Sequence, residues 1–145
     1  MSEAGVPAYP VSELTDIQEV ILKSFVTQID RKNADNANFR EVLFSTSLTQ
    51  LVVMNLKVGE EIGADVNHDI DQLIRVESGA GMAVLDGRNH DLKPGYAVVI
   101  PAAVDHNIVH TSNQRDLKLY TIYPPPAHPD GTVHHTKAEA DAAEH

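Results

Sequence analysis

The sequence contains no cysteine, no long hydrophobic run and few basic residues. Without cysteine, the 145-residue chain forms neither disulfides nor thiolate metal sites, and a reducing cytoplasm is the expected compartment. No apolar run approaches the ~18 residues of a membrane span. Residues 1–5 also lack the basic and apolar regions of a secretory signal. We therefore expect a cytoplasmic protein that makes no contact with a membrane.

The scarcity of basic residues also bears on partners. The chain carries 11 Lys and Arg against 21 Asp and Glu, a formal net charge of −10. A nucleic-acid-binding surface needs clustered Lys and Arg to neutralise phosphates, and the sequence contains no such cluster. We interpret the acidic excess as a well-solvated surface and expect no nucleic-acid partner.

Short β segments dominate the chain after residue 38. They are rich in Val, Ile, Leu and Tyr and recur about every ten residues, which is typical of an all-β sandwich or barrel. Asp86-Gly87 predicts a two-residue hairpin turn between two of them, because Asp-Gly adopts positive φ at low cost. The predicted strands are Glu41–Ser45, Leu51–Leu56, Gln72–Glu77, Gly81–Asp86, Asn89–Leu92, Ala97–Ile100, Asn107–Thr111 and Leu117–Tyr123.

The two ends of the chain have a different character. Residues 12–22 show helical apolar spacing, whereas residues 25–29 alternate and favour a strand. The polar, Asn-rich residues 31–38 predict a loop. Three prolines at 124–126 end the last strand, and residues 136–145 predict a short exposed helix capped by Thr136.

Between the strands, two groups of residues recur at a recognisable spacing. The first group is Gly59, Asp65, Asn67, Gln72 and Gly79, and the second is Gly95, Pro101, Ala103, His106 and His110. This spacing resembles the two-part motif of the cupin superfamily, in which the first part reads Gly, His-x-His, Glu, Gly and the second reads Gly, Pro-x-Gly, His, Asn. The flanking residues are similar to small cupins of the mannose-6-phosphate-isomerase-like subgroup.

The resemblance implies a cupin jelly roll, which is a double-stranded β-helix barrel with its functional pocket inside. It implies a single domain with a barrel core at about residues 39–123. Residues 1–38 and 124–145 then form short helical or irregular extensions. It also implies a homodimer, because these barrels often pair through edge strands or an N-terminal strand.

The resemblance also implies a metal site, but the expected residues have changed. In a typical cupin, two His, one Glu and a later His bind one divalent metal, whereas those positions here hold Asp65, Asn67, Gln72 and His106. Amide oxygens are weak neutral donors, so a bound ion (Mn, Zn, Ni or Fe) would be weakly held. A one-residue shift brings in His68 as a further ligand. His110, at the position of the family's Asn, shares a strand face with His106 and is a candidate for substrate binding.

Three functional hypotheses follow. In the first, the barrel binds a sugar or another small polar metabolite and catalyses an isomerase- or epimerase-like reaction. His106 then acts as ligand or general base while Asp65, Asn67 and Gln72 orient the substrate. In the second, the protein is a non-catalytic binding or sensing cupin that has lost its metal. The third is a metal-dependent dioxygenase, which the amide replacements disfavour.

Several of these residues also have plain structural interpretations. His106 and Gln72 would then be buried polar groups satisfied by neighbours, and His68 an exposed turn residue. Strand alternation from Gln72 places Arg75 on the opposite face, which weakens the case for a sugar phosphate. For the tail, either its histidines bind a metal or residues 123–135 pack over a barrel mouth or a neighbouring subunit.

Overall fold

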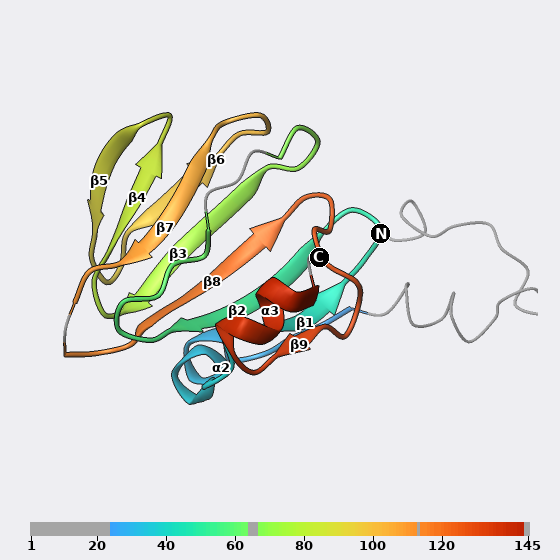
Figure 1. The fold of residues 1–145 in the computed structure, drawn as a ribbon. Coiled ribbons are helices and arrows are strands. Elements are labelled where there is room, and N and C mark those ends of the chain that lie inside the picture. Colours follow the sequence, from blue (N-terminus) through green and yellow to red (C-terminus); the bar gives the residue numbers. More distant parts are fainter. Residues whose placement is uncertain (1–23, 64–66, 113, 144–145) are drawn as a thin grey trace, which may run out of the picture.

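The structure, a computed structural model, describes residues 24–63, 67–112 and 114–143. It is an all-β jelly roll with short helices at its ends (Figure 1). Two antiparallel sheets make up the barrel. The strands are β1 (Arg40–Ser45), β2 (Gln50–Leu56), β3 (Gln72–Ser78), β4 (Gly81–Leu85), β5 (Arg88–Leu92), β6 (Ala97–Ile100), β7 (His106–His110), β8 (Leu117–Tyr123) and β9 (Val133–His134).

The larger sheet has the order β6-β3-β8-β2-β1-β9, and the smaller has the order β5-β4-β7. All eight predicted strands are present, with ends that differ by at most one residue. The predicted turn is also confirmed, because Asp86 and Gly87 have φ of 49° and 81° and join β4 to β5. The all-β prediction is therefore confirmed down to the level of single strands.

Alternation along the strands explains how the core forms. Every second residue of β8 is buried and the residues between them are partly exposed. β3 follows the same pattern, so Ile74 and Val76 enter the core while Arg75 points to the other face. Each large aliphatic side chain buried in this way contributes roughly 1.5–3 kcal/mol. The buried cluster includes Val52, Met54, Leu56, Ile74, Val76, Ile100, Ile108, Leu117 and Leu119.

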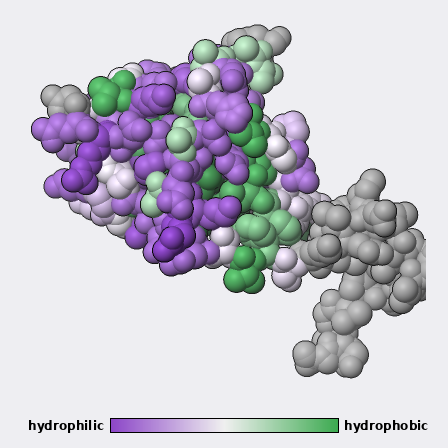
Figure 2. Space-filling model, turned by 90° about the horizontal axis from the view of Figure 1, so that it is seen from below, coloured by the Kyte–Doolittle hydropathy of each residue, from purple (hydrophilic) through white to green (hydrophobic). Residues whose placement is uncertain are grey.

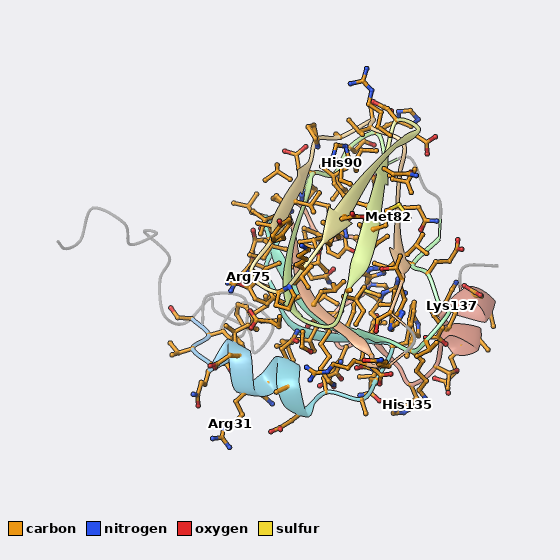
Figure 3. All side chains as sticks on the ribbon, turned by 90° about the vertical axis from the view of Figure 1, so that its left-hand side faces the viewer. Arg31, Arg75, Met82, His90, His135 and Lys137 are labelled. Atoms are coloured by element: carbon orange, nitrogen blue, oxygen red, sulfur yellow. The ribbon has the colours of Figure 1, made fainter. Side chains whose placement is uncertain are left out.

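The outer surface is mainly polar. Figure 2 shows hydrophilic residues over most of one face, with hydrophobic residues gathered in a band across it. Figure 3 shows Arg75 on one side of the barrel and Lys137, with the C-terminal helix, on the opposite side. No helix within the described ranges is long and apolar enough to cross a membrane.

Two predictions for the N-terminal part are wrong. The strand predicted at residues 25–29 is absent, because residues 25–28 are irregular and Ile29 begins a helix. This helix, α2 (Ile29–Asp35), also includes part of the predicted loop at 31–38. α2 buries only Asn33, so its sequence carries no apolar stripe that would have marked it as a helix. The helix predicted for residues 12–22 lies outside the described residues.

The C-terminal segment, defined as residues 124–143, turns back over the barrel. β8 ends at Tyr123, immediately before the three prolines, as predicted. β9 then pairs with β1, and Arg40 lies directly opposite His134. The predicted terminal helix is α3 (Lys137–Ala143), and the Thr136 hydroxyl accepts a hydrogen bond from the Glu139 backbone N–H at 3.1 Å. The sequence did not predict the two-residue strand β9.

Candidate functional site

The barrel contains a cavity of about 440 Å³ that the C-terminal segment covers. Six of its fourteen lining residues belong to this segment, which agrees with the prediction that residues 123–135 pack over a barrel mouth. The lining residues are Arg40, Ile62, Gly63, Asn67, Ile70, Gln72, His106, Tyr123, Ala127, His128, Pro129, Thr132, His134 and Ala143.

His106 is half-buried at the start of β7 and lines the cavity. Its Nδ1 lies 2.8 Å from the carbonyl oxygen of Val104. A carbonyl only accepts hydrogen bonds, so Nδ1 carries the proton and Nε2 of the neutral ring keeps its lone pair. The backbone thus fixes the tautomer in which the second ring nitrogen is a base or an acceptor.

The loop before His106 explains a departure from the cupin motif. Ala103 occupies the position where the motif has glycine, and its φ is 74°. Positive φ costs a non-glycine residue roughly 1–2 kcal/mol, so the turn tolerates alanine with some strain. The Ala103 N–H donates to the carbonyl oxygen of Asn67 at 2.6 Å, which connects this loop to the segment before β3.

Gln72, the first residue of β3, is 7% exposed and also lines the cavity. Its side-chain NH₂ donates to the Thr121 hydroxyl and to the Tyr123 hydroxyl, both at 3.1 Å. Neither bond uses its amide oxygen, which is left to accept a bond from a ligand. The Asn67 side-chain oxygen instead accepts a bond from the Asp69 N–H at 3.2 Å.

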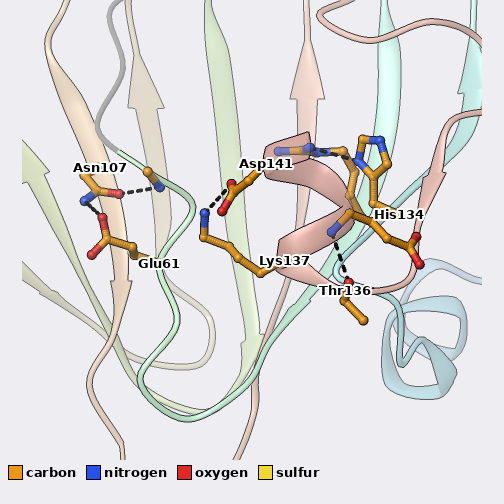
Figure 4. Close-up of polar contacts among 9 residues, drawn as sticks. Glu61, Asn107, His134, Thr136, Lys137 and Asp141 are labelled. Carbon is orange, nitrogen blue, oxygen red and sulfur yellow. Dashed lines mark hydrogen bonds and ion pairs between the residues drawn. The ribbon is translucent and has the colours of Figure 1, made fainter. Parts of the chain in front are cut away.

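Arg40, His128 and His134 form the wall of the cavity on the side of the C-terminal segment, which we call the tail-side wall. Arg40 is 3% exposed, and its guanidinium donates to Nδ1 of His134 at 3.2 Å (Figure 4). His128 packs edge-on against the Tyr123 ring, with centroids 5.3 Å apart. Nε2 of His128 is buried and has no hydrogen-bond partner among the described residues.

The environment of His128 keeps its ring neutral near pH 7. Burial, together with the charge of Arg40 and the nearby ring of His134, lowers its pKa from the ordinary 6.5 to about 4. Burial disfavours the charged ring because the cavity solvates it less well than water does, and a neighbouring cation disfavours it further. At pH 7 the His128 ring is therefore neutral, although it lies beside the guanidinium of Arg40, which stays charged.

Gln50 holds the tail-side wall in place. Its side chain is fully buried at the start of β2. The amide NH₂ donates to the carbonyl oxygen of His128 at 2.7 Å and to the Ser45 hydroxyl at 2.8 Å. The amide oxygen accepts bonds from the backbone N–H groups of Ala127 and His128, both at 3.1 Å.

The structure brings together three of the predicted site residues: Asn67, Gln72 and His106. His68 is exposed in a bend and does not line the cavity, so the plain turn interpretation fits it. His110 is 5% exposed and also lies outside the lining, because its Nε2 bonds to the carbonyl oxygen of Arg115. Asp65 lies outside the described residues.

The described side chains do not offer the donor set of a tightly held transition metal. Within residues 24–63, 67–112 and 114–143, no group of three or more His, Asp or Glu side chains is arranged to hold an ion. Of the predicted metal ligands, the imidazole of His106 and the amides of Asn67 and Gln72 line the cavity. The Asn67 oxygen already accepts a backbone N–H, and neutral amides are weak donors.

The sequence predicted that residues 123–135 pack over a barrel mouth but did not connect Arg40 with this segment. Arg40 and His134 are 94 residues apart in the chain, and no local pattern links them. Of the described tail histidines, His128 and His134 line the cavity, whereas the His135 ring bonds to the Asn38 side chain at 2.7 Å. Arg75 is where alternation predicts, outside the cavity and 3.7 Å from Glu77.

The cavity therefore sits where the cupin motif predicts a functional pocket, and comparisons with known proteins agree. The sequence profile of the cupin domain matches residues 52–123. The chain is 41% identical over 129 residues to the uncharacterised protein YrkC of Bacillus subtilis (strain 168), covering 84% of this chain and 68% of that protein. It is 40% identical over 113 residues to the uncharacterised protein L612 of Acanthamoeba polyphaga mimivirus, covering 75% and 70% of the two chains.

Solved structures give the same result. The crystal structure of BH2720 from Bacillus halodurans matches with a TM-score of 0.80 at 40% identity, over 83% of this chain and 96% of that one. A cupin-2 domain protein from Shewanella frigidimarina has the same fold, with a TM-score of 0.55 at 21% identity, over 68% and 93% of the two chains. This chain belongs to the cupin superfamily.

Proposed function

We propose that this cupin binds a small polar organic molecule, such as a sugar or another small metabolite, inside the barrel cavity. The observation that best supports this proposal is the lining of the 440 Å³ cavity. It combines polar side chains from the barrel strands with histidines of the C-terminal segment: His106, Gln72, Tyr123, Arg40, His128 and His134. Ligand pockets commonly combine an apolar wall with a few convergent polar groups, and Ile62 and Ile70 supply the apolar part here.

The chemistry that best suits this site is proton transfer on the bound molecule, as in an isomerase or epimerase. The observation in its favour is the bond from Nδ1 of His106 to the Val104 carbonyl, which leaves Nε2 free to take up a proton. Histidine is the side chain that most often serves as a general acid or base in catalysis. The resemblance to the mannose-6-phosphate-isomerase-like subgroup supports this reaction class.

A non-catalytic binding or sensing role is the second candidate. It is favoured by the replacement of three of the four family ligand positions, which hold Asp65, Asn67 and Gln72. In this role the amides and His106 would orient the ligand without reacting with it. The two candidates share the same binding site and differ only in whether His106 moves a proton.

A ligand screen with a cavity-filling variant tests the shared part of the proposal. Thr132 lines the cavity, so Thr132→Trp should fill it, whereas Thr111→Trp places the same side chain at an exposed position outside the lining. Ligand-observed NMR against sugars, polyols and hydroxy acids should give hits with the wild type and Thr111→Trp. These hits should disappear with Thr132→Trp. Hits that bind all three proteins equally would refute a cavity site.

A further inference from the structure

The outer face of the larger sheet carries a continuous row of apolar side chains, which we call the outer row. Leu73 of β3 pairs with Val99 of β6 on one side and with Ile122 of β8 on the other. Ile122 also pairs with Leu51 of β2, and a bulge in β1 brings Phe44 opposite Leu51. The outer row therefore crosses five adjacent strands of the sheet.

The outer row faces away from the core and is not fully covered. The residues before and after Leu73 and Ile122 are buried, whereas these two are only half-buried. At the edge of the sheet, Val99 is 64% exposed. Contiguous apolar side chains on a surface mark a place where another segment or molecule packs.

The described N-terminal residues lead directly to one end of the outer row. α2 packs on the same sheet face, where the Lys118 ammonium donates to the carbonyl oxygen of Asn36. Before α2, the Phe25 ring stacks on the Phe44 ring, with centroids 5.1 Å apart. Phe25 is still 38% exposed, so this end of the row has room for a further contact. The segment that precedes Phe25 therefore starts beside the outer row.

That segment has both the apolar pattern and the reach to cover the row. Residues 12–22 have the spacing of a single apolar stripe along a helix. Leu22 and Phe25 are three residues apart, a distance of ~11 Å at most. A helix over residues 12–22 is about 16 Å long, enough to extend from β1 over β2 and β8, since strands lie about 4.8 Å apart. The stripe consists of Leu14, Ile17, Ile21 and Leu22.

The rest of the same segment is suited to solvent. Its acidic residues, Glu13, Asp16 and Glu19, all fall off the apolar stripe when the segment is helical. A helix with one apolar stripe and a charged opposite face packs that stripe against another surface. The outer row is the apolar surface beside the point where this segment joins the described chain.

We propose that residues 12–22 form an amphipathic helix that docks on the outer row of its own chain. The short connection to Phe25 makes this contact intramolecular, whereas a second copy of the chain would have to reach the row from solution. The contact lies on the opposite face of the sheet from the cavity, because Leu73 alternates with the cavity residue Gln72 along β3. It is therefore independent of the proposed ligand binding.

Methyl-labelled protein of the full chain tests the contact directly. In the wild type, we expect nuclear Overhauser effects from the methyl groups of Ile17 and Ile21 to those of Leu51 and Ile122. In a mixture of labelled and unlabelled chains, isotope filtering should find these contacts only within one chain. Contacts between chains, whether from this segment or from the outer row of a second copy, would overturn the proposal in favour of an interface between copies.

Two matched variants test whether the apolar stripe makes the contact. Ile21→Asp places a charge on the stripe, whereas Val20→Asp places the same charge about 100° away around the helix. Hydrogen exchange of the amides at residues 14–22 should become at least about tenfold faster in Ile21→Asp and change less than about twofold in Val20→Asp. The Ile122 methyl resonance should shift only in Ile21→Asp. Equal effects of the two variants, or unprotected amides at 14–22 in the wild type, would refute the docked helix.

Discussion

The Gln50 side chain and the His128 backbone are joined by two hydrogen bonds across the barrel. Gln50 donates to the His128 carbonyl oxygen at 2.7 Å and accepts from the His128 N–H at 3.1 Å. The two residues are 78 positions apart in the chain. This pair fixes the C-terminal segment over the cavity, so the tail-side wall depends on a residue at the start of β2.

Replacing Gln50 with leucine should therefore loosen the C-terminal segment. Gln50→Leu removes the partners of the Ala127 and His128 backbone groups, and we expect a loss of about 2–4 kcal/mol in the free energy of unfolding. Urea denaturation measures this loss. Hydrogen exchange should show faster exchange at Ala127 and His128 than in the β3 strand.

Gln114→Leu is the matched control, because Gln114 is exposed and its side chain makes no hydrogen bond among the described residues. Gln114→Leu should change the free energy of unfolding by no more than about 0.5 kcal/mol. If Gln50→Leu were as mild as this control, the hydrogen bonds of Gln50 would not be what holds the segment.

Acid should destabilise the protein through His128. Its pKa is about 4 in the folded chain and 6.5 when unperturbed, so between these pH values only the unfolded state binds the proton. The contribution of the neutral His128 ring to the free energy of unfolding is fully present above pH 6.5. It is lost as the pH falls towards 4, by about 3 kcal/mol in total. Unfolding curves across this range should show the loss in the wild type and in the exposed-site control His90→Phe. If the same loss of stability were seen in His128→Phe, titration of groups other than His128 would be its cause.

A weakly held metal is the expectation from the donor set, in which amides replace histidine and carboxylate ligands. Protein purified without an affinity tag should contain less than one equivalent of Mn, Zn, Ni or Fe by elemental analysis. Chelation should leave the melting temperature unchanged. A stoichiometric metal that disappears in His106→Ala would show instead that the altered ligand set still binds tightly.

Whether His106 transfers a proton distinguishes an enzyme from a non-catalytic binding protein. In D₂O, an isomerase- or epimerase-like reaction should exchange a carbon-bound proton of a screening hit for deuterium, and NMR detects this as a loss of signal. His106→Gln should abolish the exchange and leave affinity within about threefold, because the amide still donates and accepts hydrogen bonds. Absence of exchange in the wild type with every hit would favour the non-catalytic role.

Local patterns predicted the barrel, because strand alternation and turn chemistry are encoded in neighbouring residues. The Asp86-Gly87 turn and the end of β8 at Tyr123 are examples. α2 was missed because its sequence is polar and its helical form depends on contacts with β2, β3 and β8. β9 was missed because it is two residues long and exists through its pairing with β1.

The candidate site could be predicted only in part, for a related reason. The cupin spacing identified Asn67, Gln72 and His106, which line one side of the cavity. The other side is built by the C-terminal segment, which has no fixed spacing from the motif. Arg40 and His128 become neighbours only when β9 pairs with β1 and Gln50 binds the tail backbone.

The most direct measurement of the central claim is the position of a bound ligand. Intermolecular nuclear Overhauser effects between a screening hit and the wild-type protein would locate it. We predict contacts to the ring protons of His106 and Tyr123, which line the cavity. Contacts confined to exposed side chains of the outer surface, such as Tyr96 and Val99, would contradict the assignment of this cavity as the binding site.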